Sequence, residues 1–285
     1  MKVLATGATG QFAGHVVSAL VERGIDVRAV VHDPNKADIA RSYGATETIS
    51  ADFTDRASLD AALDGVDGAF LITPAFHPQA TQLGLTFVEA AIAARDVGKV
   101  VYNGVYHPSL ALVNHASTRP IEAALYASEL DFTVLQPAMY MQGLDGAYEQ
   151  ALSDGTLIFP WSKHSKMTYV DYRDVAEAAA IAFTDPRLSY GTFELAAGGM
   201  IDRVELARTM SHAARTTVNA QDMPAPPAPS PDQPDGLAAM LGEYNHHGFH
   251  GGNPLALHTI LQRTPRSITD YIDELARRHA LSVAP

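Results

Sequence analysis

The chain has 285 residues, with 32 acidic against 20 basic side chains and therefore a formal net charge of −12 at pH 7. It contains no cysteine, which excludes disulfides, thiolate nucleophiles and cysteine-ligated metal sites. The charge repels phosphate backbones and the basic residues are scattered, so we expect no direct binding to nucleic acid. No stretch approaches the roughly 18 apolar residues of a membrane-spanning helix, and the N-terminus lacks the apolar core of a signal peptide. We therefore expect a cytoplasmic protein that binds no membrane.

The first half of the chain alternates short apolar runs with longer helical patterns, which is typical of a parallel sheet flanked by helices. Strands are expected at Lys2–Ala5, Val27–Val31, Glu47–Ser50, Gly68–Ile72, Val100–Asn103 and Phe132–Gln136. Helices are expected between them, at Ala13–Arg23, Asn35–Tyr43, Arg56–Leu63, Ala80–Ala94 and Ser117–Ser128. The pattern predicts an α/β fold with a doubly wound parallel sheet, whose strands are buried on both faces.

From about Met141 the pattern becomes mixed. After a helical stretch we expect strands at Gly155–Pro160, Lys166–Val170 and Thr192–Leu195, and helices at Arg173–Phe183, Asp202–Arg215, Gly236–Asn245 and Ser267–Arg278. Residues 223–234 include six prolines and read as an extended surface segment or linker. We therefore predict a nucleotide-binding sheet domain over residues 1–140. Residues 141–285 are predicted to form a smaller α+β substrate region that is interleaved with that domain and does not fold independently.

A glycine-rich turn, Gly7-Ala-Thr-Gly-Gln-Phe-Ala-Gly14, lies directly between the first strand and the first helix. In a Rossmann turn of this kind one glycine allows a tight bend and another lets backbone N–H groups approach a diphosphate. The third glycine of the pattern is replaced here by Ala13, which is tolerated. We predict that Gly7, Thr9, Gly10, Gln11 and Phe12 hold the diphosphate of a dinucleotide; the alternative is a purely structural turn.

The end of the second strand bears on the choice between the two nicotinamide cofactors. An acidic residue there binds the ribose 2′-hydroxyl of NAD, whereas a basic group accepts the 2′-phosphate of NADP. Here Val31 is followed by His32, with Lys36 close behind, while Asp33 is expected to begin the next helix. The residues therefore favour NADP(H) over NAD(H).

Several further motifs, together with the glycine turn, resemble those of the NmrA-like branch of the atypical short-chain dehydrogenases/reductases. They are Val27–Lys36, Ala51–Leu59, Val66–Pro74, Leu130–Met141 and Val170–Glu177. The resemblance implies an NADP(H)-binding Rossmann domain, with Asp52 and Phe53 beside the adenine, Thr73 and Pro74 along the ribose and diphosphate, and Asn103 near the nicotinamide. The chain departs from the family at His32 and Gln136, where the family usually has arginine.

The usual proton relay of such reductases, a tyrosine with a lysine four residues on, is missing from all eleven tyrosines. Thr118 stands where related reductases without the tyrosine have a lysine. The remaining candidates for catalysis are Tyr102, Asn103, His115 and Arg119. His115, Arg119 and Glu122 have the spacing of one helix face, although Arg119 and Glu122 could also form a plain surface ion pair.

Residues on the substrate side are predicted to be Tyr106, Tyr140, Met141 and Trp161, with core packing as the alternative for the last three. The group His246-His247-Gly-Phe-His250 has no neighbouring carboxylate and is interpreted as a loop, so no metal is expected. Asp171 and Asp174 are interpreted as residues at a helix start.

Taken together, the residues predict an NAD(P)H-dependent oxidoreductase that acts on a small apolar or aromatic carbonyl, enone or quinone. Because the proton relay is missing, a second hypothesis stays open: a regulatory protein that senses NADP(H) and binds a protein partner without chemistry. An epimerase or isomerase with bound cofactor is a third. The sequence leaves open whether the chain forms a homodimer.

Overall fold

The computed structural model describes residues 1–10, 12, 14–223 and 236–282. The chain forms two compact units. The first unit comprises Met1–Pro137 and Tyr172–Leu195, and the second comprises Ala138–Asp171 and Ala196–Pro285. The segment Tyr172–Leu195 thus belongs to the first unit, although the predicted boundary placed it with residues 141–285. It does so because its strand extends the parallel sheet and its helix packs on the first helix.

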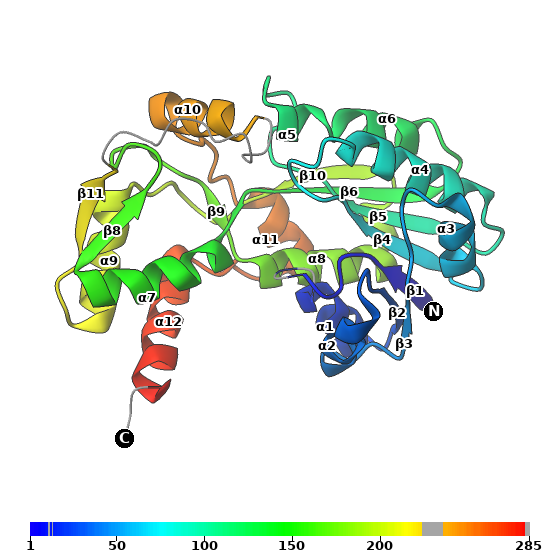
Figure 1. Ribbon diagram of the computed structural model, residues 1–285, viewed down its shortest axis with the longest axis horizontal. Coiled ribbons are helices and arrows are strands. Elements are labelled where there is room, and N and C mark those ends of the chain that lie inside the picture. Colours follow the sequence, from blue (N-terminus) through cyan, green and yellow to red (C-terminus); the bar gives the residue numbers. More distant parts are fainter. Residues whose placement is uncertain (11, 13, 224–235, 283–285) are drawn as a thin grey trace. The chain divides into compact units, whose positions relative to one another are not determined.

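The first unit is built on a seven-stranded parallel sheet within the described residues. Its order is β10-β6-β5-β4-β1-β2-β3 (Figure 1). The strands are β1 (Lys2–Ala5), β2 (Asp26–Val30), β3 (Glu47–Ile49), β4 (Gly68–Ile72), β5 (Lys99–Asn103), β6 (Asp131–Pro137) and β10 (Gly191–Leu195). This arrangement confirms the predicted doubly wound α/β fold.

Helices cover both faces of this sheet. The helices α1 (Gly14–Glu22), α2 (Ala37–Ser42) and α8 (Tyr172–Thr184) lie on one face, and α3 (Arg56–Leu63), α4 (Ala80–Ala93) and α6 (Arg119–Tyr126) lie on the other (Figure 1). The core under the second group includes Leu4, Leu71, Phe87, Val100 and Ile121, each fully buried. Such burial on both faces explains the continuous apolar runs of the strands.

The connection between β5 and α6 differs from the prediction. One helix was expected at Ser117–Ser128, whereas the structure has a short α5 (Val113–Ala116) and then α6. The break falls at Thr118, whose hydroxyl donates to the carbonyl oxygen of His115 (3.0 Å). Pro120 in the first turn of α6 suits a helix start, because that position needs no backbone N–H.

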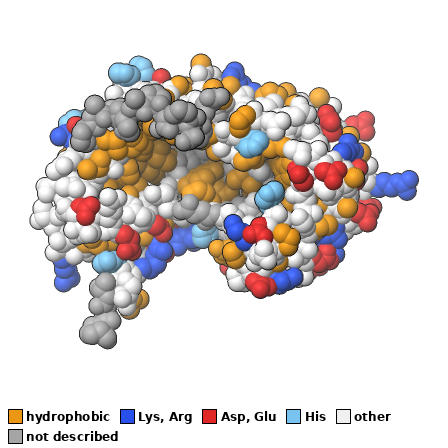
Figure 2. Space-filling view, in the orientation of Figure 1, with side chains coloured by type: hydrophobic (Ala, Val, Ile, Leu, Met, Phe, Trp, Pro, Cys, Tyr) orange, Lys and Arg blue, Asp and Glu red, His pale blue; other side chains and the backbone are white. Residues whose placement is uncertain are grey.

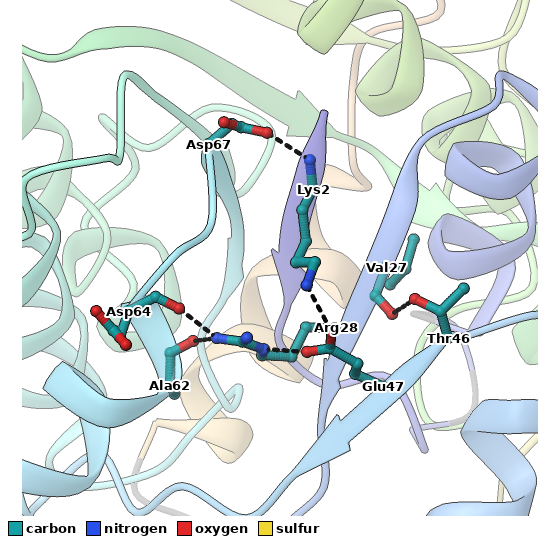
Figure 3. A network of polar contacts seen from close by, with 8 residues as sticks. All are labelled: Lys2, Val27, Arg28, Thr46, Glu47, Ala62, Asp64 and Asp67. Carbon is teal, nitrogen blue, oxygen red and sulfur yellow. Dashed lines mark hydrogen bonds and ion pairs between the residues drawn. The ribbon is translucent and has the colours of Figure 1, made fainter.

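A polar network ties together the strands at the β3 edge (Figure 3). The carboxylate of Glu47 binds Lys2 Nζ (2.5 Å) and Arg28 Nε (2.7 Å). Arg28 also donates to the carbonyl oxygens of Ala62 (3.0 Å) and Asp64 (2.6 Å). Lys2 and Arg28 hold the pKa of Glu47 below its usual value. Since Lys2 and Glu47 begin their strands, the network leaves the opposite, carboxyl ends of these strands to other interactions.

The second unit has two small parallel pairs, β7 (Met139–Tyr140) with β9 (Tyr169–Val170), and β8 (Thr156–Phe159) with β11 (Asn219–Asp222). Its helices are η2 (Met141–Leu144), α7 (Asp145–Asp154), α9 (Arg203–Ala214), α10 (Leu237–His247), α11 (Leu255–Leu261) and α12 (Ile268–Ser282). Hydrophobic side chains gather near β8 and β11 in Figure 2. β11 and α11 were not predicted, because β11 is polar and α11 is short. The proline-rich stretch lies outside the described residues beyond Met223.

Two glycines of the second unit differ in how closely they are packed. Both have a positive φ, but Gly155 (φ 69°, ψ 10°) has the left-handed helical backbone, whereas Gly248 (φ 71°, ψ −164°) has a conformation that is essentially restricted to glycine. A β-carbon at Gly155 would meet only the Thr217 oxygen at 3.8 Å, whereas at Gly248 it would lie 2.4 Å from the carbonyl oxygen of Lys166. That carbonyl accepts a backbone bond from Phe249 (2.9 Å), so it cannot move freely.

We therefore expect Gly155→Ala to lower the free energy of unfolding by about 1 kcal/mol, the cost of the left-handed backbone alone. Gly248→Ala should cost at least about 2 kcal/mol more, because the added methyl group overlaps backbone and because alanine rarely adopts the conformation of Gly248. Urea denaturation followed by circular dichroism measures both. Equal losses in the two variants would contradict the close approach at Gly248.

Candidate functional site

The order of the strands reverses at the carboxyl ends of β1 and β4. β1 connects to β2 on one side, while its other neighbour, β4, is reached only after β3. Ligands of open α/β sheets bind at such a point. The hydroxyl of Thr6, directly after β1, accepts from the backbone N–H of Ile72 (2.9 Å), and the Thr6 N–H donates to the Phe70 oxygen (3.1 Å). Thr6 thus holds the two strand ends together; the sequence analysis overlooked it because a lone threonine carries no motif.

The glycine turn follows β1 at this edge of the sheet. Gly7 has a left-handed φ of 68°, and the Gly10 N–H donates to its carbonyl oxygen (2.8 Å). A β-carbon at Gly10 would lie 3.0 Å from that oxygen, so a side chain there would distort the turn. Both glycines are exposed, whereas Thr9 and Phe12 are half-buried, and Gln11 lies outside the described residues. The turn therefore presents exposed backbone to a ligand.

The glycine that allows close packing of the first helix is Gly14. A β-carbon at this position would lie 2.4 Å from the ring of Tyr43. The pattern had assigned the packing role to position 13, where Ala13 lies outside the described residues. Gly14 is the first residue of α1 and is buried, so it sets how closely α1 lies against the chain that follows α2.

Basic side chains follow β2, at the same edge of the sheet. His32 and Lys36 are exposed, and Asp33 accepts from the N–H of Asn35 (3.0 Å) at the start of η1 (Pro34–Lys36). This use of Asp33 confirms its predicted role at a helix start. Arg41, by contrast, pairs with Asp38 (2.8 Å). The end of β2 thus offers the exposed basic groups His32 and Lys36, while Asp33 Oδ1 caps η1.

The residues assigned by resemblance to the adenine and the ribose follow β3 and β4. Asp52 Oδ1 accepts from both the N–H and the hydroxyl of Thr54 (2.8 Å each), and these bonds lower its pKa. Phe53 packs on Phe87, with the ring centroids 5.4 Å apart. Thr73 is half-buried and Pro74 is exposed. All four lie in loops that follow strands of the same parallel sheet, as does the glycine turn.

Asn103 ends β5 and is 4% exposed. Its Oδ1 accepts a hydrogen bond from the hydroxyl of Tyr172 (3.2 Å), and its Nδ2 donates to the Gly104 oxygen (3.2 Å). The Tyr172 ring, at the start of α8, lies 5.8 Å from the Phe12 ring of the glycine turn. Tyr172 therefore links the turn to Asn103. The sequence analysis quoted it within Val170–Glu177 but gave it no role, because only the fold brings α8 next to β5.

Three other predicted catalytic residues have different surroundings. Tyr102 is fully buried in the core under α4 and α6, since adjacent strand residues point to opposite faces. His115 is also fully buried, its Nδ1 lies 3.1 Å from the His107 oxygen, and burial lowers its pKa. Arg119 is exposed. The expected common face of His115, Arg119 and Glu122 is therefore absent, because the break at Thr118 puts His115 in a separate helix.

Glu122 and Gln136 form a buried pair beside β5. Glu122 is 6% and Gln136 is 5% exposed, and Gln136 Nε2 donates to both carboxyl oxygens (3.0 and 3.1 Å). A β-carbon at Gly104 would lie 3.1 Å from Glu122 Oε1, so the carboxyl group lies against the backbone that follows Asn103. Burial raises the pKa of Glu122, and the neutral amide of Gln136 only partly opposes this. The expected surface ion pair between Arg119 and Glu122 is thus not formed.

Tyr106 and its neighbour His107 lie in the loop after β5. Tyr106 is 2% exposed, and its ring centroid lies 4.0 Å from that of His107. His107 Nδ1 lies 2.6 Å from Glu194 Oε1 on β10. Burial raises the pKa of Tyr106, and the charge of Glu194 adds to this, so its hydroxyl keeps its proton. Tyr106 thus packs beside a polar pair in the first unit.

The remaining substrate candidates belong to the second unit. Tyr140 is half-buried at the end of β7, and Met141 is fully buried after it. Trp161 stacks on Phe159, with the centroids 5.0 Å apart, and its carbonyl oxygen accepts from the buried guanidinium of Arg203. Trp161 is thus half-buried and packs on Phe159. Among the described residues, no three histidine, aspartate or glutamate side chains gather in a way that would hold a metal ion.

Comparison with known proteins places these features in a family. The NmrA-like family matches residues 1–248. This chain belongs to the NmrA-like family. NAD(P)H azoreductase from Xenophilus azovorans is 28% identical over 222 residues, 74% of this chain and 73% of the relative. Quinone oxidoreductase 2 from Escherichia coli strain K12 is 27% identical over 254 residues, 87% of this chain and 88% of the relative.

A solved structure extends the comparison. NmrA, a negative transcriptional regulator in complex with NADP, matches with a TM-score of 0.78 at 18% identity, over 100% of this chain and 98% of NmrA. At this identity the likeness shows the fold alone. Within the described part of the chain, none of the helices combines the length and the apolar character needed to cross a bilayer.

The Glu122 pair leads to a pH-dependent prediction. Burial raises the pKa of Glu122 in the folded chain above its value in the unfolded chain. The protein therefore loses stability as the pH rises from the unfolded-state pKa through the folded-state pKa, because the buried carboxyl group must then become charged. Glu122→Gln keeps the shape and the acceptor for Gln136 but removes the charge. We expect the variant to have a higher Tm than the unchanged protein at about pH 8, and a much smaller difference at about pH 4.5, near the ordinary glutamate pKa. Differential scanning calorimetry across this range would contradict the assignment if the two Tm curves ran parallel.

Proposed function

We propose that the protein is an NAD(P)H-dependent oxidoreductase that acts on a small apolar or aromatic quinone, enone or carbonyl compound. The observation that carries the proposal is the glycine turn at the β1/β4 switch point, where Gly7 and Gly10 leave backbone exposed and a β-carbon would distort the turn. The family membership supports it, as do two relatives named as an azoreductase and a quinone oxidoreductase.

The residues at this edge fit a dinucleotide. Backbone N–H groups of the turn and the start of α1 would bind the diphosphate together with Thr9 and Phe12. Asp52 and Phe53 would flank the adenine, and Thr73 and Pro74 would lie along the ribose and diphosphate. The exposed His32 and Lys36 favour the 2′-phosphate of NADP(H), and Oδ1 of the nearby Asp33 is engaged by the start of η1. Asn103 would lie by the nicotinamide.

The side chains near Asn103 restrict the chemistry. When bound, the nicotinamide supplies a hydride. Tyr172 holds the Asn103 amide in one orientation, and neither is a strong acid. A simple ketone needs a proton donor as the hydride arrives. A quinone or enone needs less help, because the negative charge left by the hydride is delocalised and water can supply the proton. The missing Tyr-x-x-x-Lys pair therefore favours quinones and enones over simple ketones.

A second function has one observation in its favour. Tyr102 and His115 are fully buried and Arg119 is an exposed cation, so three of the predicted catalytic residues are poorly suited to proton transfer. A regulatory protein that binds NADP(H) and a protein partner needs no such residue, and NmrA is a regulator of this fold. Turnover with a panel of quinones and enones separates the two functions.

The cofactor site is tested by Gly10→Ala. The added methyl group would lie 3.0 Å from the Gly7 oxygen and force the turn to shift, so we expect NADPH binding to weaken about tenfold, or about 1.4 kcal/mol. Gly98→Ala is the control, because a β-carbon there meets only the Asp67 oxygen at 3.8 Å. Calorimetric titration with NADPH and NADH gives both affinities and their ratio.

Turnover is followed by the loss of NADPH absorbance with quinones, enones and ketones. If the unchanged protein bound neither cofactor, the proposal would fail entirely. If it bound NADPH but reduced nothing in the panel, the regulatory function would replace the enzymatic one.

The link between Tyr172 and Asn103 is tested by Tyr172→Phe, which removes the hydroxyl but keeps the ring beside Phe12. We expect kcat for quinone reduction to fall about tenfold while the Kd for NADPH changes little, since the lost bond orients Asn103 and does not hold the diphosphate. Tyr148→Phe is the matched control, because the buried Tyr148 hydroxyl has no partner among the described residues. Equal effects of the two substitutions on kcat would rule out the positioning role.

A further inference from the structure

The second unit contains a pocket of its own, with a volume of about 340 Å³. Every residue that lines it belongs to Ala138–Asp171 or Ala196–Pro285. It therefore does not depend on the glycine turn or on Asn103. Its volume is at the lower end of the range for small-molecule sites, and corresponds to one or two fused rings rather than to a long chain.

Three methionines line part of the pocket. Met200 is 41% exposed and presents its thioether to a ligand, whereas Met141 and Met167, at 0% and 2% exposed, are buried beside it. Thioethers are polarisable and make favourable contacts with aromatic rings, and the flexible methionine side chain adapts to the shape of a ligand. Gly199 has a left-handed φ of 83°, and a β-carbon there would meet no atom within 4 Å, so this part of the wall is open. These features favour a planar aromatic ring.

Helix α9 supplies the polar side of the pocket. The carboxylate of Glu205 binds Lys166 Nζ (2.9 Å) and accepts from the backbone N–H of Asp202 (3.2 Å). These contacts hold the pKa of Glu205 below its usual value, so it stays ionised and already paired. The Thr209 hydroxyl donates to the Glu205 carbonyl oxygen (3.0 Å). The carboxylate of Asp202 is likewise engaged, accepting from the Glu205 N–H at the start of the helix (2.9 Å).

Arg208 differs from these neighbours. It lines the pocket and is exposed, and its guanidinium makes no hydrogen bond or ion pair with any described residue. Its charge helps to lower the pKa of Glu205 from a longer distance. Arginine binds a carboxylate through two parallel N–H bonds. Beside an apolar wall, such an available cation favours a ligand that carries an acid group.

We propose that this pocket binds a planar aromatic anion, with its ring against the exposed Met200, close to the buried Met141 and Met167, and its acid group on Arg208. The inference goes beyond the proposed oxidoreductase activity and does not require it, because binding here needs neither the cofactor nor turnover. A neutral ring would leave Arg208 without a partner, and an aliphatic acid would lose the contacts between ring and sulfur.

The probe is 2-naphthoate, added without nucleotide to the full chain labelled with ¹³C at the methionine methyl groups. The chain has eight methionines, so the others report on the fold and on binding elsewhere. We expect titration to shift the resonances of Met141, Met167 and Met200, assigned by single Met→Leu variants, and to leave Met210 and Met240 nearly unchanged. Shifts confined to methionines outside the pocket, or no shift at millimolar probe, would overturn the site.

The anion is tested by Arg208→Gln with 2-naphthoate and with its neutral analogue 2-naphthamide. We expect about tenfold weaker binding of the acid, equivalent to about 1.4 kcal/mol, and unchanged binding of the amide. Arg277→Gln is the matched control, because Arg277 is exposed on α12, outside the pocket, and loses the same charge. If both variants weakened 2-naphthoate equally, or if the unchanged protein bound the amide as tightly as the acid, the assignment to Arg208 would be wrong.

Discussion

The reversal of strand order beside β1 is the constraint on which the candidate site depends. The chain leaves β1 towards β2 and β3, and returns to β4 on the other side, so the loops after β1 and β4 diverge. Thr6 holds the two strand ends together through Ile72, and Gly7 then bends the chain away. The polar network of Lys2, Arg28 and Glu47 secures the strands elsewhere on the sheet, which leaves these ends available to a ligand.

Near these strand ends, the degree of burial separates polar side chains that stabilise the fold from those that a ligand could contact. Tyr102 and His115 are fully enclosed, and burial favours the neutral form of His115. Asn103 is also buried, but Tyr172 ties it to the ring of Phe12 in the glycine turn. The polar groups closest to the turn, Asn103 and Tyr172, are thus better suited to binding and orienting a ligand than to transferring protons. A substrate that tolerates slow or solvent-derived protonation matches this environment.

The neutral Gln136 beside Glu122 has a local electrostatic consequence. A guanidinium would neutralise Glu122, whereas the amide of Gln136 donates hydrogen bonds without a charge. Glu122 consequently has a raised pKa while it lies against Gly104, one residue beyond Asn103. In the second unit the balance is reversed: Glu205 is paired with Lys166, and the exposed Arg208 makes no hydrogen bond or ion pair with a described residue. In both cases the neighbouring groups set the pKa of the glutamate: the neutral Gln136 leaves that of Glu122 raised, and the cationic Lys166 lowers that of Glu205.

The parallel sheet, its strand positions and the glycine turn could all be predicted from the residues, because they follow from local signals: apolar runs, helix caps and the short spacing of Gly7 and Gly10. The sequence also indicated the role of Asp33, whose cap bonds join residues close in the chain. Only the tertiary structure decided the partners of Tyr172, Glu122 and Arg203, since each meets residues far away in the sequence. It also decided that Tyr102 faces the core while Asn103 faces Tyr172, because that choice depends on which helices cover each face of the sheet.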